Sequence, residues 1–158
     1  MKIKILAVGK IKERYLQEGI NDYGKRLSHY VTLEFIEVKD LKAPENLSVS
    51  DKEIIKNKEG ENLLKRIGNE YVIALCIDGQ EHDSISLANK IQDIFNNNSS
   101  DITFVIGGSL GLSDEVIKRA NEAISFSKMT FPHQLMRLIL LEQLYRAFKI
   151  NNNEPYHK

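Results

Sequence analysis

Two short segments carry the residues whose types and spacing favour ligand chemistry. Gly107-Gly-Ser-Leu-Gly111 follows an apolar, strand-like run, and its glycines let the backbone approach a ligand closely. Phe126-Ser-Lys-Met-Thr-Phe-Pro-His133 follows a second such run, and Pro132 begins a long apolar helix. Because residues before a proline avoid the helical conformation, we expect Lys128 to Phe131 to run extended and to offer backbone donors and acceptors to a planar, purine-like ligand.

Each segment also has a plainer interpretation. Gly107–Gly111 lacks the Rossmann spacing and follows the fourth expected strand, so a tight turn between strand and helix explains it equally well. Met129 and Phe131 are also compatible with simple core packing. His133 and Arg137 stand one helical turn apart and could act together beside a ligand, although surface polarity is an equal alternative for Arg137.

Other kinds of site find less support. The only cysteine, Cys76, lies in an apolar run, where burial as a small hydrophobe is the better interpretation than a nucleophile. The chain has no nucleophile-elbow sequence and no Walker motif, which disfavours hydrolases and nucleoside triphosphatases. Metal binding is not expected, because the four histidines have no ligand spacing: His29, His82, His133 and His157.

Strand-like and helical patterns alternate along the chain. The expected strands are Lys2–Val8, Val31–Val38, Tyr71–Ile77, Ile102–Ile106 and Ala123–Phe126, and the expected helices are Lys12–Tyr30, Ser50–Ile67, Ser84–Phe95, Asp114–Ala120 and His133–Ile150. This alternation predicts one α/β domain over residues 1–158, a mostly parallel sheet with helices on both faces. The two segments would then lie at the carboxyl ends of strands, where such sheets bind ligands.

Two details of the connections are also predicted. Ser50-Asp-Lys-Glu53 has the spacing of a capping box and should begin the second helix. The middle of that helix, Lys56–Glu61, is strongly polar and contains Gly60, so we expect a peripheral and mobile element. Asp78-Gly79 should close the third strand as a turn.

The last helix is apolar around most of its circumference. Its apolar residues are Leu135, Met136, Leu138, Ile139, Leu140, Leu141, Leu144, Tyr145, Ala147 and Phe148. A helix of this kind needs a second surface to bury it, and a single sheet offers no further layer at its end. We therefore expect a homodimer built on this helix, with a central helix of a monomeric core as the alternative.

Bulk composition sets further limits. The chain has 158 residues and balanced charge, 22 basic against 22 acidic side chains, so no global positive field indicates nucleic acid. From Val116 onward cations outnumber anions, which permits a local basic face, although a solvated surface without a partner explains the same charges about as well. No run is long enough to span a membrane and no signal peptide is recognisable, so a cytoplasmic protein without membrane attachment is expected.

Longer motifs in the same regions resemble one family. They are Phe104-Val-Ile-Gly-Gly-Ser-x-Gly111, Ser125-Phe-Ser-Lys-Met-Thr-Phe-Pro-His-Gln134, Leu140-x-Glu-Gln-Leu-Tyr-Arg-Ala-Phe-Lys-Ile150 and Pro155-Tyr-His-Lys158, with Ile5-Leu-Ala-Val-Gly-Lys10 and Lys42-Ala-Pro-Glu-Asn46 earlier in the chain. They look like the ribosomal large subunit methyltransferase H family, a branch of the SPOUT or α/β-knot methyltransferases. The resemblance covers the whole chain.

The resemblance implies a cytoplasmic homodimer whose C-terminal segment forms a trefoil knot. It also implies methyl transfer from S-adenosyl-L-methionine to N3 of a pseudouridine in 23S rRNA of the assembled ribosome. By family pattern the cofactor would contact Leu75, Gly107, Phe126, Ser127, Lys128, Met129, Thr130 and Phe131. The near-zero net charge suits a whole ribosome recognised by shape better than free RNA.

The resemblance also directs attention to the C-terminal tail. The transferred methyl group is already activated, so the enzyme must mainly align the acceptor nitrogen and help remove its proton. We hypothesise that Tyr156, His157 and Arg146 line the target pocket and that His133 supports it. The ordinary alternative is a frayed terminus. The sequence leaves open which residue is the base and how two subunits would share a site.

Two other functions remain as alternatives. A SPOUT methyltransferase acting on tRNA would share the fold and the cofactor, although the chain has no strongly basic extension for binding free RNA. A non-enzymatic nucleotide-binding dimer would explain the α/β pattern and the last helix, but it would leave the tail without a purpose.

Overall fold

In the computed structural model, the described residues, 1–42 and 44–158, form five strands that alternate with five helices. Ala43, one member of the Lys42–Asn46 motif, lies outside the described residues. The elements are β1 (Lys2–Val8), α1 (Arg14–Leu27), β2 (Thr32–Val38), α2 (Val49–Leu64), β3 (Tyr71–Glu81), α3 (Ser84–Asn97), β4 (Asp101–Ile106), α4 (Asp114–Arg119), β5 (Glu122–Ser125) and α5 (His133–Asn151).

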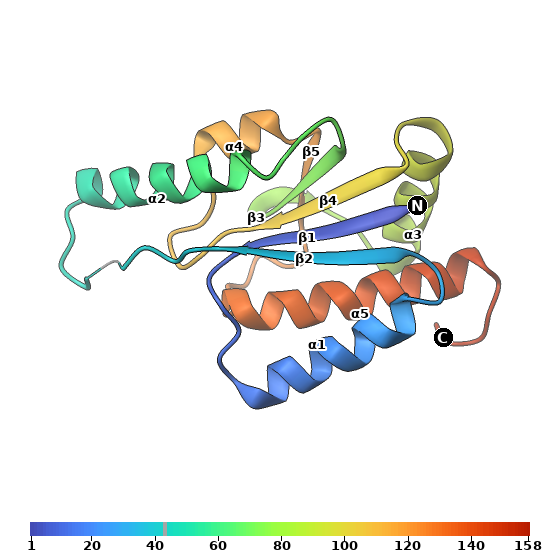
Figure 1. Ribbon diagram of the computed structural model, residues 1–158. Coiled ribbons are helices and arrows are strands. Elements are labelled where there is room, and N and C mark those ends of the chain that lie inside the picture. The colour runs from blue at the N-terminus through green and yellow to red at the C-terminus, as the bar shows by residue number, and fades with distance from the viewer. Residues whose placement is uncertain (43) are drawn as a thin grey trace.

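The strands form one sheet in the order β2-β1-β4-β3-β5, and every neighbouring pair is parallel (Figure 1). Phe104 of β4 lies opposite both Ile5 of β1 and Ile73 of β3, which sets the register at the centre of the sheet. Since all strands run the same way, the loops that follow them meet at one edge. The predicted α/β class and parallel sheet are confirmed.

Helices cover both faces of the sheet, because successive side chains of each strand point to opposite sides. On one face, Ile3, Ile5 and Phe104 pack in a core with residues of α1, α3 and α5. On the other, Leu6 and Val8 belong to a smaller core with residues of α2 and α4. Figure 1 shows α1 and α5 beneath the sheet and α2 and α4 above it.

Helix α5 is buried more fully by its own chain than its sequence predicts. It lies on the sheet with α1 along one side and α3 along the other, and Leu140, Leu141 and Leu144 are buried. Leu138 packs so closely on α1 that a Cβ added to Gly19 would lie 2.9 Å from its Cδ1. α1 and α3 thus bury the two flanks of α5, and all three helices lie in one layer on the same face of the sheet.

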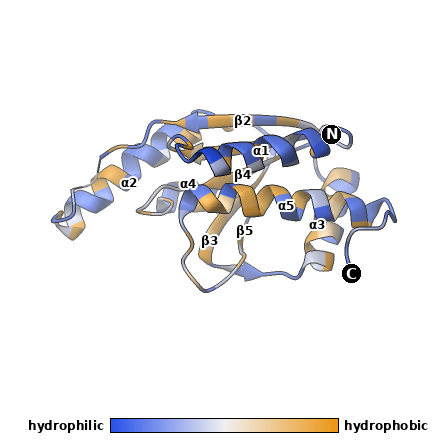
Figure 2. Ribbon diagram, turned by 90° about the horizontal axis from the view of Figure 1, so that it is seen from below, coloured by the Kyte–Doolittle hydropathy of each residue, from blue (hydrophilic) through white to orange (hydrophobic). Residues whose placement is uncertain are grey.

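Figure 2, which views this face from below, still shows apolar residues along α5. Several of them are only partly buried: Leu135, Met136, Leu138 and Ile139. This half-buried surface is compatible with a homodimer, which stays a prediction.

The helix starts differ by a residue or two from the sequence expectation. Ser48, and not Ser50, begins α2, since its hydroxyl accepts the Asp51 N–H at 3.1 Å and donates to the Asp51 carboxylate at 2.8 Å. Asp83 caps α3 in the same way by accepting the N–H of Ser86. An aspartate at the third helical position satisfies a capping arrangement as glutamate does.

Strand β3 continues through Asp78-Gly79 to Glu81, so the predicted turn there is wrong. Leu75 and Gln80 both lie opposite Ile124 of β5, which means that the residues between them bulge out of the ladder. Glycine is required at position 79, because a Cβ there would lie 2.5 Å from the carbonyl carbon of Ile124. The bulge occurs at the carboxyl edge of the sheet, where it shapes the site described below.

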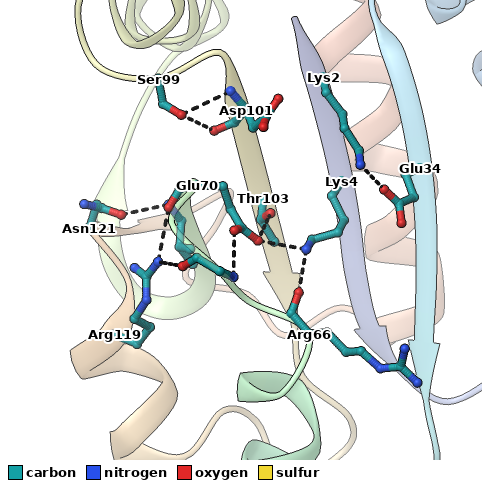
Figure 3. Close-up of polar contacts among 12 residues, drawn as sticks. Lys2, Lys4, Glu34, Arg66, Glu70, Ser99, Asp101, Thr103, Arg119 and Asn121 are labelled. Atoms are coloured by element: carbon teal, nitrogen blue, oxygen red, sulfur yellow. Dashed lines mark hydrogen bonds and ion pairs between the residues drawn. The ribbon is translucent and has the colours of Figure 1, made fainter.

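The amino edge of the sheet carries a polar cluster around Glu70, which precedes β3 (Figure 3). Its carboxylate accepts hydrogen bonds from the Gly68 N–H at 2.7 Å and the Thr103 hydroxyl at 3.0 Å, and it pairs with Lys4 at 2.8 Å. Arg119 donates to the backbone carbonyls of Gly68 and Glu70. These contacts join β1, β4, the connection that precedes β3 and the end of α4. They lie at the edge of the sheet opposite the Gly107–Gly111 loop.

No helix in the part of the chain that the structure describes is long and apolar enough to cross a bilayer. Within residues 1–42 and 44–158, no group of three or more His, Cys, Asp or Glu side chains is arranged to hold a metal ion. The trefoil knot implied by the resemblance stays a prediction.

Candidate functional site

A cavity of about 770 Å³ lies at the carboxyl edge of the sheet, beyond the ends of β3, β4 and β5. We call it the carboxyl-edge cavity. Four segments line it: Leu75–Ile77 at the bulge of β3, Ile106–Leu112 from the end of β4 onward, Ile124–Ser127 at the end of β5, and Met129–His133 with Met136 at the start of α5. The two segments singled out in the sequence therefore face each other across one cavity.

The Gly107–Gly111 loop folds tightly back on itself. Gly108 and Gly111 form an isolated antiparallel bridge, with the Gly111 N–H donating to the Gly108 carbonyl at 3.1 Å. Gly111 has φ +81°, a conformation that favours glycine. A Cβ on Gly107 would lie 2.7 Å from the Gly111 carbonyl carbon, so only glycine permits this close approach. The loop therefore presents bare backbone to the cavity.

The segment after β5 is bent, not extended as predicted. Ser125 donates its hydroxyl proton to the Ser127 carbonyl at 2.9 Å, and the Ser127 hydroxyl accepts the Met129 N–H at 3.0 Å. These two bonds turn the chain, so that Met129 and Phe131 line the cavity while remaining solvent-exposed at 73% and 37%. Lys128 is exposed and does not line the cavity.

The β3 bulge supplies the third wall through Leu75, Cys76 and Ile77. Burial raises the pKa of the Cys76 thiol, and the negative charge of Asp78 raises it further, while backbone N–H groups oppose both effects. A thiol with a raised pKa stays protonated at neutral pH and is a poor nucleophile. Cys76 therefore acts here as a small apolar wall residue, in line with the interpretation from the sequence.

His133 and Arg137 do not act as one unit. His133 lines the cavity, and burial together with the charge of Arg137 lowers the pKa of its imidazole, against a smaller opposite effect of Asp40. Arg137 is buried and donates to the Glu37 carboxylate at 2.6 Å and to the carbonyls of Val8 and Gly9, each at 2.7 Å. Its role is to tie the first turns of α5 to the ends of β1 and β2.

The C-terminal tail folds back onto α5 and is not frayed. Arg146 donates to His157 Nδ1 at 3.2 Å, and its guanidinium carbon lies 4.8 Å from the centre of the Tyr156 ring. The Tyr156 hydroxyl donates to Glu142 at 3.3 Å. Burial, with hydrogen bonding to Tyr23 and the charge of Glu142, raises the pKa of Tyr156 to about 12, so its phenol is a donor at neutral pH.

The tail cluster and the cavity are far apart within one chain. Arg146 follows His133 by 13 positions on the same helix, which at 1.5 Å per residue is about 20 Å. Arg146, Tyr156 and His157 are absent from the cavity walls. The structure thus brings together three of the four residues predicted to be catalytic, but it separates them from His133.

The predicted cofactor residues are placed together much more closely. Seven of the eight line the carboxyl-edge cavity: Leu75, Gly107, Phe126, Ser127, Met129, Thr130 and Phe131. The exception is Lys128. Sequence reasoning did not include Cys76 and Ile77, although their position directly after Leu75 was a usable signal. It also gave no role to Glu59, which lies behind the Gly107–Gly111 loop.

Known proteins are similar to this chain over its whole length. The family model described as "Predicted SPOUT methyltransferase" matches residues 1–157. A protein of Clostridioides difficile named "Ribosomal RNA large subunit methyltransferase H" is 60% identical over 159 residues, covering all of both chains. A protein of the same name from Exiguobacterium is 56% identical with the same coverage.

A solved structure shows a related fold at much lower identity. The tRNA (m1G37) methyltransferase from Aquifex aeolicus superposes with a TM-score of 0.55 and 12% identity, covering 92% of this chain and 70% of that one. At that identity the likeness concerns the fold alone.

Proposed function

We propose, from the premise that this chain belongs to the SPOUT methyltransferase family, that it methylates a base of large-subunit ribosomal RNA with S-adenosyl-L-methionine as methyl donor. The finer proposal is transfer to N3 of a pseudouridine in 23S rRNA of the assembled ribosome. One observation supports methyl transfer to large-subunit rRNA: seven of the eight residues expected to bind the cofactor line a single cavity, in a chain 60% identical to a relative named "Ribosomal RNA large subunit methyltransferase H".

The carboxyl-edge cavity suits S-adenosyl-L-methionine in size and chemistry. Its volume of about 770 Å³ is within the range for sites that enclose nucleotide-sized ligands. Leu75, Ile106 and Phe126 provide apolar walls on which a purine ring can pack. Gly107 and Gly108 line the cavity, and the absence of their Cβ atoms lets the loop pack tightly against Gly111 and Val8. The cofactor, when bound, would supply an activated methyl group.

The chain's own contribution is alignment, exclusion of water and control of the acceptor proton. Met129 and Phe131 stand exposed at the cavity, where they can cover a bound ligand and keep water from the methyl group. His133 has a lowered pKa, so its imidazole is neutral at pH 7 and can accept a proton or a hydrogen bond. Loss of the N3 proton requires such a group, or donors that stabilise the resulting anion.

The position of the tail indicates that it would act in a second copy of the chain. Since Arg146 lies about 20 Å along α5 from His133, the tail of the same chain does not complete the cavity. We propose that Tyr156 and His157 act on the target base in the cavity of the partner subunit of a homodimer. The rigid contacts of Arg146 with both residues would hold them in position for this role.

Charges around the cavity favour one direction of approach for the RNA. The loops after β1 and β2 expose the cations Lys10, Lys12 and Lys39. The end of β3 and the residues just before α3 expose the anions Asp78, Glu81 and Asp83. Phosphates bind cations and are repelled by carboxylates, so the RNA backbone should cross the β1 and β2 side of the cavity.

This direction can be tested by charge reversal. The double variant Lys10→Glu, Lys12→Glu should lower methylation of ribosomes while leaving the affinity for S-adenosyl-L-methionine unchanged. Lys25→Glu is the matched control, because Lys25 is an exposed lysine near the C-terminal end of α1, at the opposite edge of the sheet. Equal activities of the double variant and the control would contradict the proposed direction.

The function itself is tested by calorimetry and methyl incorporation. We expect the protein to bind S-adenosyl-L-methionine and to transfer tritiated methyl groups to ribosomes or large subunits from a strain that lacks this protein. Mass spectrometry of the digested rRNA should then find the methyl group on a pseudouridine. Greater incorporation into tRNA than into ribosomes would favour the tRNA alternative. Absence of cofactor binding would favour a non-enzymatic nucleotide-binding dimer.

A further inference from the structure

The polar middle of α2 is a buried contact surface and not a peripheral stretch. Glu59 is only 3% exposed, and Gly60 beside it is also buried. Carboxylates are rarely buried to this extent without a cationic partner, since removing their charge from water is costly. The sequence gives no reason for burial here, because both residues lie among the charged side chains of Lys56–Glu61.

These two neighbouring residues contact the Gly107–Gly111 loop and the helix start that follows it. Glu59 Oε1 would lie 3.6 Å from a Cβ built on Gly108, so the carboxyl group sits directly behind the loop. A Cβ on Gly60 would lie 2.2 Å from the Ser113 hydroxyl, which caps α4 by accepting the Val116 N–H. The middle of α2 thus supports the loop near its start and just beyond its end.

The Glu59 carboxyl has an incomplete set of partners. Oε2 accepts the N–H of Leu41 at 3.1 Å, while Oε1 is buried without a hydrogen-bond partner among the described residues. The charged group that acts on it is Asp40, next to Leu41, and Val8 and Gly108 present no charge to it. Burial raises the pKa of Glu59, the Leu41 N–H opposes this, and Asp40 raises it further.

Asp40 connects this carboxyl to the far side of the cavity. Its side chain packs against Gly9, where an added Cβ would lie 3.5 Å from the Asp40 Cβ. Its charge also acts on His133, which lines the carboxyl-edge cavity. A change in the charge of Glu59 therefore alters the surroundings of Gly108 directly. It also acts on Asp40, whose charge in turn affects His133.

We propose that Glu59 is a positioning residue for the cofactor: its buried carboxyl group, with Gly60, holds the Gly107–Gly111 loop in the conformation that binds the ligand. The effect on cofactor binding rests on the proposed function. The contact of Glu59 and Gly60 with the loop does not depend on it. Ionisation of Glu59 places an unpaired negative charge behind Gly108 and beside Asp40. The support of the loop then weakens, because a charged carboxylate is costly to bury without a partner and is drawn towards water.

The test compares Glu59→Gln and Glu59→Ala with Glu61→Gln and Glu61→Ala, which change an exposed glutamate of the same helix. Glutamine keeps an acceptor for the Leu41 N–H without a charge, whereas alanine removes the support without harming helix propensity. We expect Glu59→Ala to weaken binding of S-adenosyl-L-methionine on the order of tenfold, as for loss of a buried hydrogen bond. Glu59→Gln and both Glu61 variants should bind as the wild type does at low pH.

Two pH titrations separate positioning from a general structural role. Cofactor affinity of the wild type should fall as the pH rises through the raised pKa of Glu59, while Glu59→Gln should show no such fall. The amide ¹⁵N shift of Gly108 in the free protein should report the titration of Glu59 in the wild type. In Asp40→Asn the titration should move to lower pH, because Asp40 raises the pKa of Glu59, and in Glu59→Gln it should be lost.

The free-protein titration distinguishes this inference from the proposed function. If the Gly108 signal titrates but no S-adenosyl-L-methionine binds, the loop support stands and the cofactor assignment fails. If the Gly108 signal is the same in the wild type and in Glu59→Gln at every pH, Glu59 does not act through the loop and the inference is overturned. Equal cofactor affinity of Glu59→Ala and Glu61→Ala overturns it as well.

Discussion

Replacing Glu70 with glutamine should destabilise the fold without affecting the carboxyl-edge cavity. Glu70 is the centre of the polar cluster at the amino edge of the sheet, and its side chain is 11% exposed (Figure 3). Its carboxylate joins β1 through Lys4, β4 through Thr103 and the preceding turn through Gly68. Glutamine has nearly the same shape, so the variant removes the charge and retains part of the hydrogen bonding.

The magnitude follows from the pKa of this carboxyl group. Burial alone would raise it, but hydrogen bonds from Lys4, from backbone N–H groups and from Thr103 outweigh burial and lower the pKa from 4.5 to about 2. A difference of about 2.5 in pKa corresponds to about 3 kcal/mol. Because the folded state has the lower pKa, this stabilisation is complete above pH 4.5 and is lost as the pH falls towards 2.

The assay is urea denaturation at fixed protein concentration, at pH 7 and at several values between pH 5 and pH 2.5. Glu70→Gln should lose about 2–3 kcal/mol of unfolding free energy at pH 7, and the gap to the wild type should narrow below pH 4.5. The matched control is Glu18→Gln, which breaks an exposed helical pair with Arg14 and should cost less than about 0.5 kcal/mol. Equal losses in the two variants, or a gap that does not change with pH, would refute the reasoning.

Three further variants test other contacts. Gly107→Ala should weaken cofactor binding, because its Cβ would lie 2.7 Å from the Gly111 carbonyl carbon and overpacking costs about 1–3 kcal/mol. The control is Gly24→Ala, whose Cβ would lie 3.9 Å from its nearest neighbour and which should bind the cofactor normally in calorimetry. Arg137→Met should lower the free energy of unfolding by about 3 kcal/mol, since the backbone carbonyls of Val8 and Gly9 lose their donor. An unchanged midpoint of urea denaturation would show that Arg137 is dispensable for stability. Deleting residues 156–158 should abolish methyl transfer to ribosomes while dimerisation and cofactor binding persist, and full activity would exclude the tail from the reaction.

Much of the candidate site was predictable because it depends on local sequence. Strand ends, glycines and the proline that starts α5 fix where loops occur, and parallel strands bring those loops to one edge. For this reason Gly107 and Phe126 were expected near one another and do line one cavity, whereas Leu75 was expected there only from the family resemblance. The bend at Ser127 was not expected, because it depends on hydroxyl hydrogen bonds that any serine could make or omit.

The sequence by itself determined the alternation of strands and helices, the one-domain α/β fold class and the two segments that face the cavity. The tertiary structure alone decided which polar residues are buried. Glu59 lies in a strongly polar stretch of helix, and surface polarity was an equal interpretation for Arg137, yet both side chains are covered by elements distant in the chain. Burial and partner choice depend on such long-range contacts, which leave no periodicity in the sequence. The same reason applies to the tail, because the contacts of Tyr156 and His157 with α5 join residues that no sequence pattern links.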